Sequence, residues 1–199
     1  MILYYSSASP YARYVRASLI SLNLADRVEL CSLHPFDNPE ALMSNNPLGK
    51  VPCLVNDEQQ ALYDSEVIVN YLDAEFGDNA LSRAMFNNWP LQVSFSLTKG
   101  LLDTLVARQQ EKMREKEQLG SAFWMQRFDN AIARSLSQLN QDVAMLPEQL
   151  TKLHLLIVCA CDYLNFRHPD VEWQSKYPSL VDFYRTWAEL PALANTRPS

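Results

Sequence analysis

The amino-acid sequence predicts a mixed α/β domain followed by an all-helical domain. Short apolar runs alternate with helical spacing up to about residue 77, and only helical periods remain beyond residue 78. The length of 199 residues allows one domain or two small ones. We therefore expect an α/β domain over residues 1–77 and a helical domain over residues 84–199, with the boundary near residues 77–84.

The α/β half opens with a run of β-branched and aromatic residues, Ile2–Tyr5, which predicts a strand. Val15, Leu19 and Leu22 then recur at i, i+4 and i+7 and predict a helix. The expected elements are strands at residues 2–5, 28–33, 51–55 and 61–63 and helices at residues 10–23 and 65–75. The last two strands are expected to pair as a hairpin, and Gly77 is expected to end the last helix.

The second half carries long helical periods that end near prolines. Leu97, Leu101 and Leu105 illustrate the spacing. The expected helices run over residues 85–116, 121–145, 150–164 and 179–189. The charged run at residues 111–117 is interpreted as the solvated end of the first of these helices rather than as a binding site.

The charge balance argues against a nucleic-acid surface. Seventeen Lys and Arg against 23 Asp and Glu give a net charge of -6, without a clear basic stripe. The longest strongly apolar segment, Leu153–Ala160, falls far short of the roughly 20 residues that span a bilayer. We therefore expect neither a nucleic-acid partner nor a membrane span.

The N-terminus and the cysteines together predict the compartment. The first residues have the pattern of a strand rather than of a signal peptide, so we expect the mature protein to begin at Met1. Cys31, Cys53, Cys159 and Cys161 show neither a disulfide framework nor zinc-ligand spacing. Unpaired thiols suit a reducing compartment, which predicts a cytoplasmic protein without a metal site.

The most informative segment runs from Asn46 to Leu54. Its Pro52 stands at the start of a predicted strand, where the missing N–H is tolerated if the preceding backbone turns out of the sheet. A cis bond between Val51 and Pro52 would do this, and it would direct the Val51 N–H and C=O towards an incoming peptide. An ordinary trans proline on an edge strand accounts for the same residues.

Asp64, Ser65 and Glu66 stand at the start of the helix expected at residues 65–75. Asp64 or Ser65 is a natural N-cap, and the N–H groups of the first turn form a small anion site. The carboxylate of a peptide ligand would fit there, with Asp64 or Glu66 pairing with its ammonium group. Capping without any ligand is the alternative interpretation.

The turn expected between the first strand and the first helix contains three serines, Ser6, Ser7 and Ser9. A hydroxyl at this helix N-terminus would donate to a thiolate and lower the pKa of a bound thiol below its ordinary value of about 8.5. The nucleophile would then be the sulfur of a ligand. Helix capping alone also explains the serines. A dithiol redox enzyme would carry C-x-x-C at this turn, so the sequence Ser9–Ala12 excludes dithiol exchange here.

In this order and spacing the motifs resemble those of the glutathione transferase superfamily, most closely its bacterial, theta- or zeta-like members with serine-type sites. The similarity covers nearly the whole chain. It is carried by Ser9–Arg13, Asn46–Pro52, Asp64–Ile68, Tyr177–Leu180 and Thr196–Pro198, of which the second and third are the more specific. The resemblance implies a thioredoxin-like N-terminal domain with the element order βαβαββα, followed by an all-helical C-terminal domain.

The resemblance also implies a glutathione site. Val51, before the family's cis-proline Pro52, would exchange backbone hydrogen bonds with the cysteinyl part of glutathione. Asp64 and Ser65 would hold the γ-glutamyl end, and Lys50 would approach the glycine carboxylate. These residues would bind glutathione as a co-substrate, with no metal involved.

Two serines compete for the thiol-activating role in this resemblance. Ser9 matches the position at which omega-like relatives carry cysteine, and Ser7 is the neighbouring candidate. Tyr5 and Tyr11 fit either an apolar pocket for a second substrate or ordinary core packing.

Two positions depart from the family pattern. Asp64 stands where Glu or Gln is usual and is one methylene shorter, so we expect a slightly weaker hold on the γ-glutamyl group. His154 stands where the core helix usually has the Asp of a Ser/Thr-x-x-Asp capping box. We expect that His154 does not replace the acid, and that the helix starts on Thr151 alone or on different contacts.

The implied function is attack of the glutathione thiolate on a small electrophile, or a related thiol-dependent reaction, by a homodimeric enzyme. A non-catalytic member of the superfamily that binds a partner protein, as stringent-starvation-like proteins do, would have the same fold. The complete set of expected glutathione ligands favours the enzyme.

Overall fold

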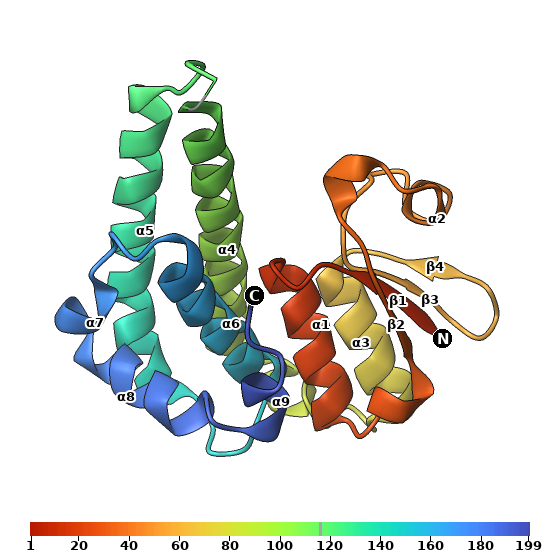
Figure 1. The fold of residues 1–199 in the computed structure, drawn as a ribbon. Helices are drawn as coiled ribbons and strands as arrows, with labels where there is room; N and C mark the ends of the chain where they lie inside the picture. The colour runs from red at the N-terminus through yellow and green to blue at the C-terminus, as the bar shows by residue number, and fades with distance from the viewer. Residues whose placement is uncertain (116) are drawn as a thin grey trace.

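A four-stranded mixed sheet stands beside a group of helices (Figure 1). The computed structural model describes residues 1–115 and 117–199. The strand order is β2-β1-β3-β4. β1 (Ile2–Tyr5) is parallel to β2 (Glu29–Ser32) and antiparallel to β3 (Cys53–Val55), and β3 is antiparallel to β4 (Ala61–Leu62). This sheet and its helices confirm the thioredoxin-like prediction.

Two helices cover the sheet. α1 (Pro10–Ser21) and α3 (Ser65–Phe76) lie side by side, and the short α2 (Glu40–Met43) lies in the connection between β2 and β3 (Figure 1). Leu3 and Leu54 from the two central strands are fully buried. The apolar stripes of α1 and α3 complete this core, as their helical spacing predicted.

The ends of α1 have local causes. Ser9 is the N-cap, since its Oγ accepts a hydrogen bond from the Ala12 N–H at 3.2 Å, and Pro10 follows at the first helical position. The helix ends at Ser21, before the predicted residue 23, and Asn23 adopts a left-handed φ of 57°. Asn tolerates this conformation better than most residues, so the chain turns here towards β2.

The second half is helical, and α6 (Lys152–Arg167) is its buried centre. α4 (Trp89–Glu115) and α5 (Ala122–Asp142) form a long antiparallel pair, and α6 packs against α4 and against α1 (Figure 1). The remaining helices are α7 (Trp173–Lys176), α8 (Pro178–Trp187) and α9 (Pro191–Ala194). The helical half that was predicted is therefore present.

Most predicted boundaries lie within a few residues of those observed. α4 begins at Trp89 rather than at residue 85, because Arg83–Met85 forms a separate 3-10 turn, and its predicted end at Lys116 lies outside the described residues. α5 ends at Asp142, where a 3-10 turn at Val143–Met145 follows. The four-residue helices α2, α7 and α9 are too short for hydrophobic periodicity to reveal them.

A buried ion pair joins the two halves of the chain. Arg13 of α1 is almost fully buried, and its Nη2 lies 2.6 Å from Oδ2 of Asp162 on α6 and 3.1 Å from the Leu193 carbonyl oxygen. Tyr184 of α8 donates to the other Asp162 oxygen at 2.6 Å. Removing one partner of such a pair leaves an uncompensated buried charge, at a cost of about 3–5 kcal/mol. The pair therefore holds α1 in one position against the helical half.

The start of α6 corrects the expectation for His154. Nδ1 of this buried histidine accepts a hydrogen bond from the Thr151 backbone N–H at 3.2 Å, and the Thr151 Oγ1 lies 2.7 Å from the same nitrogen. His154 thus takes the place of the acid in the capping box. Burial lowers the pKa of His154 to about 4, which keeps the ring neutral and Nδ1 able to accept.

A second buried histidine, His168, is neutral for a similar reason. Its Nδ1 lies 2.9 Å from Nη1 of Arg108 and its Nε2 lies 3.0 Å from the Leu105 carbonyl oxygen. A guanidinium only donates, so Nδ1 accepts and Nε2 carries the proton. Burial, followed by the charge of Arg108, lowers the pKa of His168 to about 4.

We expect the protein to lose stability as the pH falls from about 6.5 to about 4. In this window the histidines of the unfolded chain take up protons that the folded ones do not. The free energy of unfolding should therefore fall by about 1.4 kcal/mol per pH unit for each histidine.

His154→Gln keeps an acceptor for the Thr151 N–H and should remove the contribution of one histidine to this slope. Urea unfolding of both proteins at several pH values measures the difference, and equal slopes would contradict the role given to His154.

Candidate functional site

The strand register brings three chain segments to one edge of the sheet. Tyr4 pairs with Cys53, and Leu54 pairs with Leu62, so the end of β1, the start of β3 and the end of β4 lie together. The turn into α1, the Val51–Pro52 segment and the start of α3 continue from these three ends. We call the predicted residues gathered here the strand-end site: Ser7, Ser9, Lys50, Val51, Pro52, Asp64 and Ser65.

The segment before β3 has the conformation that the sequence analysis proposed for it. The Val51–Pro52 bond is cis, as is the neighbouring Tyr63–Asp64 bond, and β3 begins after Pro52. Within the described part of the chain, the Val51 N–H and C=O form no hydrogen bond with the protein. Both groups therefore remain available to a ligand.

Asn46 shapes the loop that leads to this segment. Its side chain is buried, its Nδ2 donates to the Lys50 carbonyl at 2.8 Å, and its Oδ1 accepts from the Leu48 N–H at 3.0 Å. Gly49 has a φ of 60°, a left-handed conformation that glycine adopts without a steric penalty. This role of Asn46 was not predicted, because a side chain that stabilises its own loop leaves no periodic signal. The Lys50 residue itself is exposed.

The two candidate serines differ in what their hydroxyl groups do. Ser9 Oγ accepts from the Ala12 N–H, which leaves its own O–H as a donor. Ser7 Oγ donates to the backbone oxygen of Ser199 at 3.0 Å. Ser9 therefore combines a place at the N-terminus of α1 with a hydroxyl proton that no described residue accepts.

At the start of α3 the N-cap is Asp64 rather than Ser65. Asp64 Oδ1 accepts from the Glu66 N–H at 3.0 Å, and Ser65 is the buried first residue of the helix. Both expected residues therefore lie at the helix N-terminus, where backbone N–H groups favour an anion.

Lys99 joins this site from α4 and was not predicted. Its Nζ lies 3.1 Å from Oδ2 of Asp64 and 2.8 Å from Oε2 of Glu66. Burial acts to lower the pKa of Lys99, but the hydrogen bonds to Glu66 and Asp64 outweigh it and raise the pKa. Lysine on a long helix has the sequence signal of a solvated face, so only the packing of α4 against the sheet half reveals this contact.

Tyr11 also contacts α4, one helical turn further along. Its hydroxyl donates to Oδ1 of Asp103 at 2.5 Å. Burial, followed by the hydrogen bond to Asp103, raises the pKa of Tyr11, so the phenol remains protonated. Beside the start of α1, Tyr11 therefore packs its ring against the core and turns its hydroxyl towards Asp103.

Cys53 lies beside the site without the properties of a nucleophile. The thiol is fully buried, and this burial raises its pKa to about 11. A protonated thiol is a poor nucleophile and a poor metal ligand. Cys53 is therefore part of the core next to Pro52.

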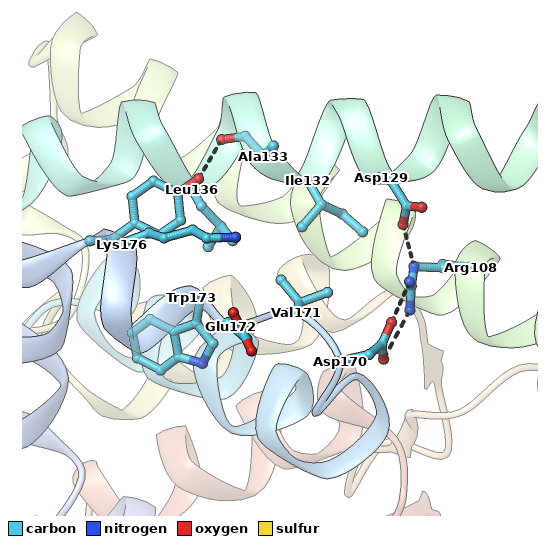
Figure 2. Close-up of a pocket in the computed structure, with 11 residues that line it drawn as sticks. Arg108, Asp129, Ile132, Ala133, Leu136, Asp170, Val171, Glu172, Trp173 and Lys176 are labelled. Carbon is cyan, nitrogen blue, oxygen red and sulfur yellow. Dashed lines mark hydrogen bonds and ion pairs between the residues drawn. The ribbon is translucent and has the colours of Figure 1, made fainter.

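A hollow of about 290 Å³ lies elsewhere, between α4, α5 and α7 (Figure 2). Arg108 at its edge pairs with Asp129 at 2.7 Å and with Asp170 at 2.6 Å, and Tyr177 donates to the Ala133 carbonyl at 3.1 Å. The charges of Arg108, Asp129 and Asp170 satisfy one another, and none of the residues of the strand-end site lines this hollow.

The described residues hold no group of three or more His, Cys, Asp or Glu side chains arranged to bind a metal ion. No helix in the same residues is both long and apolar enough to cross a membrane.

Similarity to known proteins decides the family. Residues 3–80 match the family described as Glutathione S-transferase, N-terminal domain. A glutathione transferase family member from Pseudomonas fluorescens Pf-5, solved with bound glutathione, is 33% identical, has a TM-score of 0.92, and is matched over 98% of its length by 100% of this chain. The chain belongs to the glutathione transferase superfamily.

Two further proteins are similar to this chain along nearly the whole length. The glutathione S-transferase of Methylobacillus flagellatus KT, solved with glutathione bound, is 27% identical with a TM-score of 0.90, and the match covers 100% of this chain and 99% of that one. The uncharacterized GST-like protein YibF of Escherichia coli (strain K12) is 26% identical over 197 residues, which are 97% of this chain and 96% of that protein. The glutathione transferase fold therefore extends through the helical half as well.

Ser9→Ala should destabilise the protein by about 0.5–2 kcal/mol, because the Ala12 N–H loses its capping acceptor. Ser9→Asn, which keeps an acceptor at the cap, should remain close to the wild type, and Ser7→Ala should change stability by less than about 0.5 kcal/mol. Urea unfolding measures all three variants. A Ser9→Ala protein as stable as the wild type would contradict the capping role.

Proposed function

We propose that this protein binds glutathione at the strand-end site and activates its thiol for attack on a small electrophile. The observation that carries the proposal is the Ser9 O–H at the N-terminus of α1, which donates to none of the described residues, together with the Val51 N–H and C=O, which also lack a partner among them. The solved relatives from Pseudomonas fluorescens and Methylobacillus flagellatus bind glutathione, which supports the same ligand here. The proposal includes the division into domains at residues 1–77 and 84–199.

Ser9 is the proposed thiol-activating residue. Its hydroxyl would donate to the sulfur while its oxygen still accepts from the Ala12 N–H, so binding the thiolate would not cost the helix its cap. The N-terminus of α1 adds a positive dipole end, which favours the ionised sulfur. Ser7 is the weaker candidate, because its hydroxyl already donates to the backbone oxygen of Ser199.

The remaining residues would position the tripeptide. The backbone N–H and C=O of Val51 would pair with the cysteinyl part. Asp64 and Ser65 at the start of α3 would hold the γ-glutamyl end, and the exposed Lys50 would pair with the glycine carboxylate. Held in this way, the sulfur would lie next to Ser9, and attack would break the bond between the electrophile and its leaving group or open its activated double bond.

Ser9→Ala and Ser9→Asn should both lower the turnover of 1-chloro-2,4-dinitrobenzene by about tenfold or more, while glutathione affinity changes much less. Both variants lack the hydroxyl, and only Ser9→Asn keeps the helix cap, so a shared loss is caused by the hydroxyl rather than by instability. Titration calorimetry with glutathione and the initial rate of conjugation are the measurements.

Each outcome of this experiment has a distinct meaning. Unchanged turnover in both variants would remove Ser9 from the mechanism. Glutathione binding without turnover of any electrophile would favour the non-catalytic, partner-binding alternative. A wild-type protein that does not bind glutathione would overturn the proposed function.

The proposal also includes a homodimer formed through α4. Trp89 and Val93 lie one turn apart on this helix and are 71% and 67% exposed, and an added Cβ at Gly100 further along would meet no atom within 4 Å. An exposed apolar and small-residue stripe on a long helix allows close approach of a second copy. A cytoplasmic location, inferred from the unpaired cysteines, is part of the same proposal.

Val93→Glu should convert a dimer into a monomer, because it would place a charge in the apolar stripe that the second copy would bury. Phe123→Glu is the matched control, since Phe123 on α5 is 68% exposed and lies outside the proposed interface. Size-exclusion chromatography with light scattering measures the mass. A monomeric wild type, or a Val93→Glu protein that remains dimeric, would contradict this interface.

A further inference from the structure

The turn of α4 that faces the strand-end site carries two opposite charges with different neighbours. Lys99 is held by Asp64 and Glu66 at 3.1 and 2.8 Å. Asp103, one turn further along, is exposed, and its hydrogen-bond partner is the Tyr11 hydroxyl. No Lys, Arg or His of the described residues lies within ion-pair distance of Asp103. The carboxylate of Asp103 is therefore an exposed acid without an ion-pair partner among the described residues.

Tyr11 places this charge close to the proposed reaction. Tyr11 lies two residues after Ser9, in the first turn of α1, and its hydroxyl reaches Asp103 at 2.5 Å. The hydrogen bond occupies one carboxylate oxygen and restrains the side chain. The second oxygen has no partner among the described residues and remains able to accept. A group that approaches the thiol from the α4 side would therefore meet a fixed carboxylate.

We propose that Asp103, positioned by Tyr11, makes the second-substrate site selective for electrophiles that carry a positive charge. This inference rests on the proposed function. In the reaction, the glutathione sulfur forms a bond to an electrophilic carbon, the leaving group departs with its bonding electron pair, and the thiol proton passes to solvent. Asp103 takes no part in this chemistry. It stabilises the cationic part of the substrate while the sulfur attacks, and it repels anionic substrates.

The test uses three 1-chloro-2-nitrobenzenes that differ at the position para to chlorine, where they carry a nitro, a carboxylate or a trimethylammonium group. The value of kcat/KM with saturating glutathione is measured for the wild type, Asp103→Asn, Asp103→Glu and the control Asp182→Asn, which removes an exposed acid on α8. Each protein is compared with the wild type on the same substrate, so the different intrinsic reactivities of the three compounds cancel.

Asp103→Asn should lower kcat/KM for the trimethylammonium compound by about three- to tenfold, as expected for one partly solvated charge at close range. The neutral compound should change by less than about twofold, and the carboxylate compound should improve. Asp103→Glu should retain the preference of the wild type, and Asp182→Asn should leave all three values unchanged. The thermal stability of each variant is measured alongside.

A parallel fall for all three compounds in Asp103→Asn would indicate a purely structural link between α1 and α4 and would overturn the inference. If Asp103→Asn has the same kcat/KM as the wild type for each of the three compounds, and glutathione still binds, the inference is also overturned. The proposed function would then stand. If the wild type binds no glutathione and converts none of the compounds, both proposals are wrong.

Discussion

The antiparallel pairing of β3 with β1 and with β4 is the constraint on which the rest of the molecule depends. Leu3 and Leu54 are fully buried in the two central strands, so a shift of register by one residue would turn these side chains out of the core. The hydrophobic core thereby selects the register. The register in turn brings the end of β1, the start of β3 and the end of β4 to one edge, where the strand-end site forms.

Helix α4 completes that site from the other half of the chain. Lys99 compensates the acidic start of α3, while Asp103 stays exposed and is held by Tyr11. These contacts require a fixed position of the helical half against the sheet half. The buried pair of Arg13 and Asp162 provides it, because separating the two would leave both charges desolvated and unpaired.

Two neutral histidines provide hydrogen-bond partners for buried polar groups in the helical half. His154 accepts from the backbone N–H of Thr151, the N-cap residue of α6, and His168 accepts from Arg108 while donating to the Leu105 carbonyl. A neutral imidazole offers one acceptor and one donor, so it satisfies buried partners without the desolvation cost of a carboxylate. This chemistry ties folding to pH, because both rings must remain unprotonated for the contacts to hold.

The sequence by itself determined the order of the strands and of the longer helices, the change from α/β to helical character and the family, because periodicity and the Asn46–Pro52 and Asp64–Ile68 motifs are local signals. It did not reveal the roles of Asn46, Lys99, Asp103 and His154, and it left the Ser9 and Ser7 alternatives open. Those roles depend on which atoms meet across the fold. Lys99 and Asp103 have the sequence pattern of a solvated helix face. His154 was not expected in the capping box, because a neutral imidazole lacks the charge of the usual acid. Only the tertiary structure shows that a ring nitrogen of His154 takes the place of the acid, and that Lys99 and Asp103 of α4 contact the starts of α3 and α1. The physical reason is that packing between segments distant in sequence decides which polar groups find partners.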